Sequence, residues 1–147
     1  MTTRIALVRI ADYADSVREL FAANWAETGF DFPLEPDIAQ YQALQDAGAL
    51  FALAAWRGAD IVGYSSAFVQ PSLFNPAVVC CASDALFVHP SFRAGTLGAR
   101  LIVATEDEAR RRGASRMLWH TRAGTPLARA MLRRGYQPAD TVVMKEI

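Results

Sequence analysis

The stretch "LFVHPSFRAGTLGARLI", residues 86–102, decides the fold. An apolar run ends at His89-Pro90, an arginine and two glycines follow, and the chain then takes the pattern of an amphipathic helix. A strand that leads through such a turn into a helix presents unpaired backbone N–H groups at the positive end of the helix dipole. The stretch therefore predicts a site for a phosphate or pyrophosphate group, with Arg93 adding a fixed charge. The alternative is a tight turn whose glycines only satisfy backbone geometry.

The patterns on either side of this stretch predict an element order of β α α β β β α β α β. The expected elements are a strand over 4–10, a helix from Asp12 as N-cap to Gly29, a helix over 37–47, two strands around the hairpin signal 57–60, a strand over 77–89, a helix over 98–112, a strand over 116–120, a helix with Thr125 as N-cap and Pro126 at its first position, and a last strand within 135–147.

Length and charge limit the classes of protein. The chain has 147 residues, which predicts a single domain over 1–147, and its 15 basic and 15 acidic residues cancel. No broad positive field attracts nucleic acid or an anionic membrane, and no apolar run approaches the roughly 18 to 20 residues that cross a bilayer. The start of the chain lacks the pattern of a signal peptide. We expect a cytoplasmic protein without a nucleic-acid or membrane partner.

Cys80 and Cys81 are the only cysteines and are neighbours in an apolar run. Successive strand residues point to opposite faces, so a disulfide between them would be strained, and two thiols cannot complete a zinc site. The sequence predicts two buried free thiols and no metal site.

Two common phosphate-binding motifs do not match the turn. No Gly-Lys-Ser/Thr is present for a Walker A loop, and "GTLG" has the wrong spacing for the dinucleotide fingerprint. The turn does resemble the acetyl-CoA-binding motif V-x-P-x-x-R-G-x-G-x-G-x-x-L of the GNAT superfamily of N-acetyltransferases. The residues that carry this resemblance are Val88, Pro90, Arg93, Gly95, Gly98 and Leu101.

The resemblance extends to the element order, and within the family the chain is most similar to small members found in phage genomes. It implies an α/β GNAT-like fold with a mixed, mostly antiparallel sheet flanked by helices. The sheet would be splayed between two parallel central strands, one ending at Val88 and the other at His120.

The resemblance also implies the residues that bind acetyl-CoA as cosubstrate. Strand-edge backbone groups of Leu86, Phe87 and Val88 would hold the pantetheine arm. The backbone amides that would wrap the pyrophosphate belong to Arg93, Ala94, Gly95, Thr96, Leu97, Gly98 and Ala99. Thr96 stands where the family commonly has glycine, and a β-branched residue resists a positive φ.

Acetyl transfer needs a neutral amine, a polarised thioester carbonyl and a proton for the departing thiolate. Asp84 is the carboxylate of the central strand, and an acid in so apolar a run is either the base or a side chain bonded near a strand irregularity. His120 either shuttles a proton or caps the end of a strand. Met131 occupies the position where the family commonly has its tyrosine acid, and methionine cannot donate that proton.

A group of aromatic and acidic residues lies where the family places its acceptor-side loop: Trp25, Glu27, Phe30, Asp31 and Phe32. An acidic rim would suit an amine, and the alternative is a helix end whose apolar residues enter the core.

The sequence thus predicts acetyl-CoA-dependent N-acetylation of a small-molecule or protein amine. The alternative, which Met131 and Thr96 keep open, is a catalytically weak acyl-CoA-binding or assembly module. An exposed strand edge or the apolar loop "PSLFNP" could support a homodimer.

Overall fold

Five strands form one sheet in their chain order. The computed structural model describes residues 2–147, and its strands are β1 (Thr3–Leu7), β2 (Leu50–Arg57), β3 (Asp60–Pro71), β4 (Val79–Val88) and β5 (Ala114–Leu118). Neighbours among β1 to β4 are antiparallel, whereas β4 and β5 are parallel. The expected mixed, mostly antiparallel sheet with one parallel pair is confirmed. The expected central position of that pair is wrong for the described residues, because β5 is an edge strand and the segment after α4 adds no strand beyond it.

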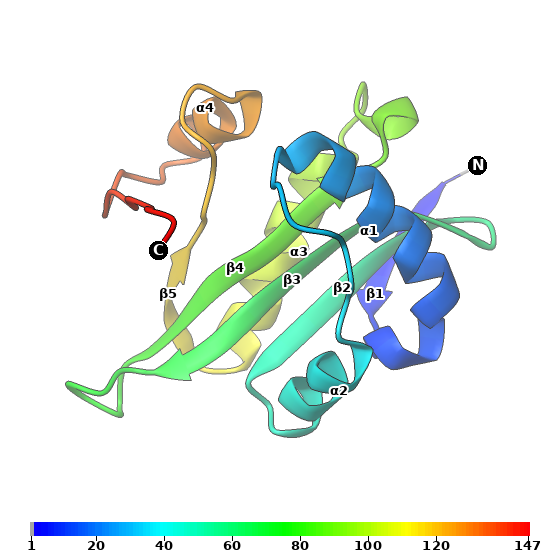
Figure 1. Ribbon diagram of the computed structural model, residues 1–147. Helices are drawn as coiled ribbons and strands as arrows, with labels where there is room; N and C mark the ends of the chain where they lie inside the picture. Colours follow the sequence, from blue (N-terminus) through cyan, green and yellow to red (C-terminus); the bar gives the residue numbers. More distant parts are fainter. Residues whose placement is uncertain (1) are drawn as a thin grey trace.

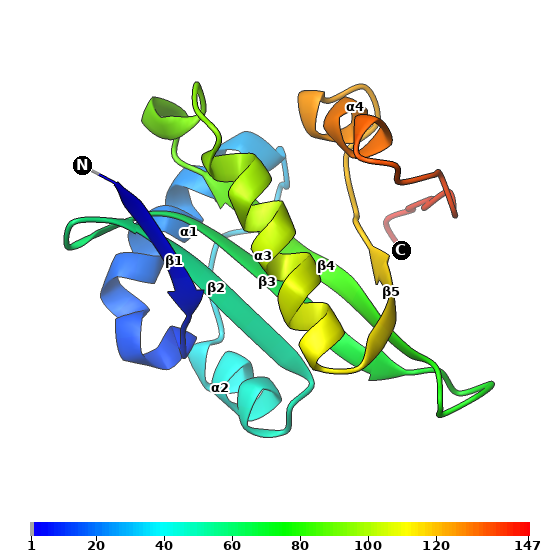
Figure 2. The same ribbon diagram turned by 180° about the vertical axis from the view of Figure 1, so that it is seen from behind.

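Helices cover both faces of the sheet (Figures 1 and 2). The front face, as we call it below, carries α1 (Ala14–Thr28) and α2 (Ile38–Asp46), and the back face carries α3 (Leu97–Arg111). A fourth helix, α4 (Pro126–Arg133), follows β5, and two 3-10 turns, η1 (Ile10–Tyr13) and η2 (Pro90–Phe92), precede α1 and α3.

Both faces of β2 are buried because successive side chains enter different cores. Leu50 and Ala52 pack with Val17 and Phe21 of α1 on the front face. Phe51 and Leu53 pack on the back face in the cluster that contains Leu97, Leu101 and Ala109 of α3. These two cores hold α1 and α3 against the sheet. The C-terminal end of α1 and the N-terminal end of α3 therefore have fixed positions relative to β4.

Local capping signals locate most helix ends. Gly29, at φ 71°, ends α1, and the Thr125 side chain accepts a hydrogen bond from the backbone N–H of Ala128 at the start of α4. The expected N-cap at Asp12 is wrong. Asp12 lies in η1, where its N–H donates to the carbonyl of Arg9, and α1 begins only at Ala14.

The expected last strand is also wrong. The N–H of Tyr136 donates to the carbonyl of Met131, and within residues 2–147 no hydrogen bond joins the chain after Tyr136 to any other residue. The segment 141–147 has strand-forming residues, but a strand requires a partner with which to exchange backbone bonds. Val142, Val143 and Met144 consequently remain 77%, 87% and 89% exposed.

Two irregularities of β4 position the site. The parallel pairing with β5 ends at Ala82 opposite Leu118, so residues 83–88 of β4 continue beyond it. On the other edge, Ser66 of β3 pairs with Ala85 and Ala67 with Ser83, which leaves Asp84 as the extra residue of a β-bulge. The first feature is the expected splay of the sheet, and the second is the strand irregularity that could accommodate Asp84.

Cys80 and Cys81 are both free, but only Cys81 is fully buried, and burial raises the pKa of its thiol. The loop between β3 and β4 leaves Leu73 and Phe74 fully exposed at the tip of a long hairpin.

Candidate active site

The turn between η2 and α3 presents a row of backbone N–H groups. The first helical hydrogen bond of α3 runs from Arg100 N–H to the Thr96 carbonyl, so the N–H groups of residues 97–99 have no acceptor within the helix. No side chain caps this end and no acid lies in the first turn. Thr96 has φ −95° and ψ 3°, so its β-branched side chain meets no positive φ here.

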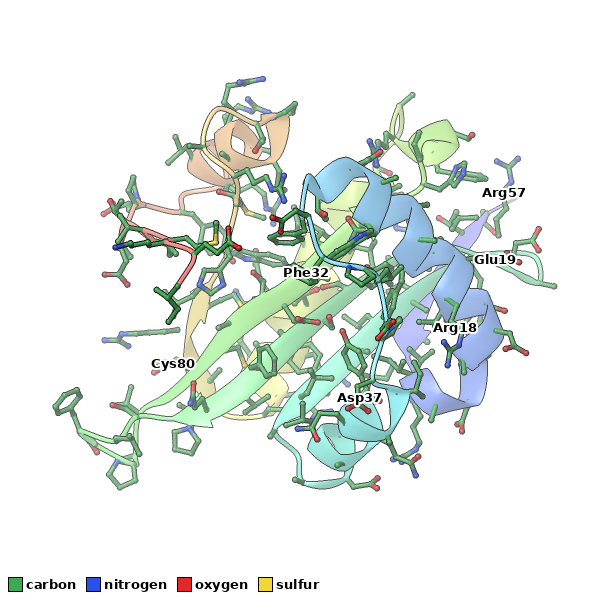
Figure 3. All side chains as sticks on the ribbon, viewed as in Figure 1. Arg18, Glu19, Phe32, Asp37, Arg57 and Cys80 are labelled. Atoms are coloured by element: carbon green, nitrogen blue, oxygen red, sulfur yellow. The ribbon has the colours of Figure 1, made fainter. Side chains whose placement is uncertain are left out.

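The glycines of the turn face open space. A Cβ built on Gly95 or Gly98 would meet no heavy atom within 4 Å. Packing within the protein therefore does not require glycine at either position, whereas close approach of a ligand to the backbone would. A cavity of about 270 Å³ lies against the turn, lined by residues 94–97 together with Arg57 and Arg100. Arg57 is labelled in Figure 3.

Arg93 connects the turn to the rest of the molecule. Its Nε donates a 2.7 Å hydrogen bond to the carbonyl of Val88, and one terminal nitrogen lies 2.9 and 2.8 Å from the two carboxylate oxygens of Glu27 in α1. The guanidinium also lies 5.3 Å from the ring centre of Phe87. Arg93 thus fixes the end of β4 against α1, beside the amides that the sequence assigns to the pyrophosphate.

The open edge of β4 leads from this turn toward Asp84. Leu86, Phe87 and Val88 belong to the part of β4 that extends past β5. At the point where the strands separate, the backbone N–H of His120 donates a 2.8 Å bond to Ser83 Oγ. The imidazole Nδ1 lies 3.2 Å from the Ser83 carbonyl. A carbonyl only accepts, so Nδ1 carries the proton of this bond and Nε2 is the nitrogen left to exchange one.

Asp84 is held from the front face by two hydroxyl groups. Ser66 Oγ donates to its Oδ2 at 2.7 Å, and the phenol of Tyr41 in α2 donates to the same oxygen at 3.4 Å. Within residues 2–147 no partner is found for Oδ1, and the residue as a whole is exposed. The bulge therefore presents a carboxylate with one oxygen anchored and the other free.

Burial and the charge of Asp84 affect the neighbouring tyrosines. Burial raises the pKa of Tyr41 above its ordinary value, and the nearby Asp84 carboxylate raises it further. The pKa of Tyr64 is raised chiefly by burial as well, although the hydrogen bond from Asn24 Nδ2 to its hydroxyl acts in the opposite direction. Both phenols are neutral hydrogen-bonding groups at neutral pH.

The aromatic group expected on the acceptor side lies at the end of α1 and on the connection from α1 to α2. The ring centres of Trp25, Phe30 and Phe32 lie 4.8 to 5.3 Å apart. The guanidinium of Arg122, from the segment between β5 and α4, lies 5.3 Å from the ring centre of Phe30. Figure 3 shows Phe32 on this connection, in front of the sheet. Phe30 and Phe32 are 49% and 57% exposed, so they do not enter the core.

The last helix supplies no acid to the site. Met131 of α4 is buried, and its neighbour in the fold, Tyr136, donates its hydroxyl proton to Glu106 of α3 at 2.9 Å. Burial raises the pKa of Tyr136. The phenol of Tyr136 is thus engaged with α3.

Sequence reasoning singled out Asp84 and His120 as candidates, but it did not find Ser66 and Tyr41, which contact Asp84. These residues lie 18 and 43 positions from Asp84, and a serine in a strand or a tyrosine on a helix has no local pattern that distinguishes it. The pairing of β3 with β4 and the docking of α2 bring them together.

None of the helices within residues 2–147 has the length and apolar composition that crossing a membrane requires. Nowhere in the same described stretch do three or more His, Cys, Asp or Glu side chains gather closely enough to hold a metal ion.

Comparisons with solved structures agree with this fold. A ribosomal-protein-alanine N-acetyltransferase from Brucella melitensis biovar Abortus 2308 superposes with a TM-score of 0.75 at 20% identity, over 99% of each chain. The aminoglycoside acetyltransferase meta-AAC0020, from an uncultured soil metagenomic sample, gives 0.75 at 18% identity over 99% of this chain and 94% of its own. AAC(6')-Iy, solved with the bisubstrate analogue CoA-S-monomethyl-acetylneamine, gives 0.77 at 17% identity over 100% and 99%.

At these identities the solved structures establish the fold alone. A search of curated protein sequences found no significant match. The sequence model described as Acetyltransferase (GNAT) family matches residues 14–136, which span the front-face helices, the bulge at Asp84, the turn before α3 and α4. The chain therefore belongs to the GNAT family of acetyltransferases.

Proposed function

We propose that this protein transfers the acetyl group of acetyl-CoA to a primary amine of a small molecule or a protein. The observation that carries the proposal is the position of Asp84. It is the extra residue of the β4 bulge, anchored through Oδ2 and open at Oδ1, beside the strand edge that leads to the turn before α3.

The binding roles follow from the backbone. The N–H groups of residues 94–99, with the charge of Arg93 beside them, bind the pyrophosphate of acetyl-CoA. The N–H of Arg93 itself, which the resemblance included, donates to the Pro90 carbonyl instead. The β5-facing edge of residues 86–88 pairs with the pantetheine arm as an added strand would. In this binding mode the thioester lies near residues 83 and 84. The supporting observation is that β5 has separated from β4 beyond Ala82.

The transfer itself is a balanced exchange of protons. Asp84 Oδ1 takes a proton from the ammonium group, and the neutral nitrogen attacks the thioester carbonyl carbon. The C–N bond forms, the C–S bond breaks, and CoA departs as a thiolate. On becoming an amide, the nitrogen loses its second proton to water, and Asp84 passes the first proton to water as well. His120, protonated at Nε2, gives the thiolate its proton, because Met131 cannot. Much of the rate comes from holding the two substrates together.

Met131 favours a second candidate, an acyl-CoA-binding or assembly module that retains the fold with little catalysis. The buried methionine leaves the α4 side of the site without a proton donor.

Two measurements on one sample distinguish these functions. Acetyl-CoA is added while the melting temperature is followed, since a ligand that binds the native state raises apparent stability. Thiol release is then measured with a panel of amines, and mass spectrometry identifies products heavier by one acetyl group. The proposal expects stabilisation and amine-dependent thiol release. Stabilisation without turnover supports the module, and no stabilisation at saturating acetyl-CoA contradicts both.

A further inference from the structure

The front face around Asp84 is aromatic. The large aromatic residues exposed in the described part of the chain are Tyr13, Phe30, Phe32, Phe68 and Phe74, and three of them lie on this face. Phe68 follows Ser66 by two residues in β3, so both side chains point to the front face about 7 Å apart along the strand. Phe30 and Phe32 approach from the connection between α1 and α2.

Phenyl rings that remain exposed to water lack the free energy that burial of their apolar surface would provide. A group of such rings beside a carboxylate with one free oxygen is typical of a binding surface. Phe68 is 37% exposed, whereas Ser66, two residues before it on the same face of β3, is almost fully buried. The other rings of this face, Tyr41 and Tyr64, contact Phe21 with centre distances of 5.8 and 5.1 Å and are thus engaged in the core. Phe30, Phe32 and Phe68 therefore have apolar area available to a ligand whose charged end meets Asp84.

The charges of this face suit one ammonium group better than several. Both oxygens of Glu27 face Arg93, and the Asp37 side chain caps α2. Asp31 and Glu35, on the same connection, are exposed carboxylates that water and salt screen. Arg122 adds a positive charge over Phe30, which repels additional ammonium groups.

From this combination we propose that the acceptor is a monoamine with an aromatic or large apolar body. Its ammonium group meets Oδ1 of Asp84, and its body covers the exposed rings of Phe68 and Phe32. This inference rests on the proposed acetyltransferase function and names the substrate class for that same site. It separates this chain from the aminoglycoside acetyltransferases that share its fold, because an aminoglycoside carries several ammonium groups and a hydroxylated body.

The test compares 2-phenylethylamine with ethylamine, spermidine and the aminoglycoside kanamycin at saturating acetyl-CoA. We expect kcat/KM to be at least tenfold higher for 2-phenylethylamine than for each of the others. Phe68→Ser and Phe32→Ser should remove most of this advantage through a higher KM, while the Kd for acetyl-CoA stays the same. Phe74→Ser, at the exposed tip of the β3–β4 hairpin, is the matched control and should leave both constants unchanged. If Phe68→Ser does not fold, Phe68→Leu removes the ring while keeping an apolar side chain.

The outcomes separate this inference from the proposed function. Faster acetylation of spermidine or kanamycin than of 2-phenylethylamine would overturn the inference and leave acetyl transfer intact. If no amine is acetylated, the proposed function fails, and binding of 2-phenylethylamine to the acetyl-CoA-loaded protein is measured by calorimetry. Saturable binding that Phe68→Ser weakens at least tenfold would still support the monoamine site, and absence of binding would overturn it.

Discussion

Ser66 Oγ donates a 2.7 Å hydrogen bond to Oδ2 of Asp84 across the bulge that makes Asp84 the extra residue of β4. Ser66 is almost fully buried, whereas Asp84 is exposed. The serine therefore connects a carboxylate at the protein surface to the rigid centre of the sheet. A base held in this way keeps its orientation without losing contact with its substrate.

Ser66→Ala should lower kcat by about tenfold, since a hydrogen bond to a charged group contributes about 1.5 to 3 kcal/mol and here orients the base. The matched control is Ser65→Ala, which also removes a buried bond, the 2.8 Å contact between Ser65 and Thr105 on the back face. Both variants should lose stability. Equal kcat values per folded molecule for the two variants would refute the orienting role of Ser66.

Gly98 should show opposite effects on stability and on ligand binding. It lies in the first turn of α3, where a Cβ would meet nothing within 4 Å, so Gly98→Ala should raise the unfolding free energy by about 0.5 to 1 kcal/mol. Gly98→Val should weaken acetyl-CoA binding at least tenfold, or about 1.4 kcal/mol, because a branched side chain obstructs the approach of the phosphates. Thermal melting and calorimetry measure the two quantities. Unchanged affinity in a folded Gly98→Val protein would show that the glycine serves only the turn.

Arg93 and Glu27 make different contributions although they form one ion pair. Their side chains are 44% and 45% exposed, so Glu27→Gln should cost at most about 1 kcal/mol of stability and should retain acetyl-CoA binding. Arg93→Ala removes both the bond to the Val88 carbonyl and the charge beside the pyrophosphate amides. It should weaken acetyl-CoA binding, and more strongly at low salt because the lost interaction is electrostatic. Equal affinities for the two variants across salt concentrations would contradict this assignment.

Tyr41 and Tyr64 should make the fold sensitive to alkaline pH. Burial raises both pKa values above the ordinary value of 10.0, so the folded state retains phenol protons that the unfolded state releases. Their contribution to stability is complete below about pH 10 and declines as the pH rises from there toward the folded pKa values. The melting temperature should therefore fall as the pH rises above about 10, and Tyr64→Phe should flatten this decline. If neither Tyr41→Phe nor Tyr64→Phe changes the slope of melting temperature against pH, this role of the two tyrosines is contradicted.

Local signals predicted most of the fold from the sequence. Thr125 followed by Pro126 starts α4, and Gly29 ends α1, because capping depends on residues close in the chain. The last strand failed for the opposite reason. Strand-forming residues at 141–147 give a local preference, but pairing depends on an edge elsewhere in the fold, and no backbone partner for this segment is found within residues 2–147.

Some residues of the candidate site could likewise be recognised from the sequence, whereas their contacts depend on the fold. Asp84 was visible as an acid in an apolar run, and the turn at residues 93–99 was visible as a motif. The bulge that allows Asp84 to be exposed appears only when β3 pairs with β4. Ser66 and Tyr41 become partners of Asp84 only through that pairing and the docking of α2. Likewise, Arg93 is a motif residue in the sequence, but its bidentate contact with Glu27 depends on where α1 ends.

The most direct measurement is amine-dependent thiol release by Asp84→Asn, taken on the same sample as its melting temperature and its Kd for acetyl-CoA. Asp140→Asn, in the exposed C-terminal segment, is the matched control. The account predicts that Asp84→Asn keeps its fold and its affinity for acetyl-CoA, while turnover falls by roughly 10² or more and the acidic limb of the pH–rate profile disappears. Full turnover per folded molecule, with unchanged pH dependence, would contradict the assignment of Asp84 as the base.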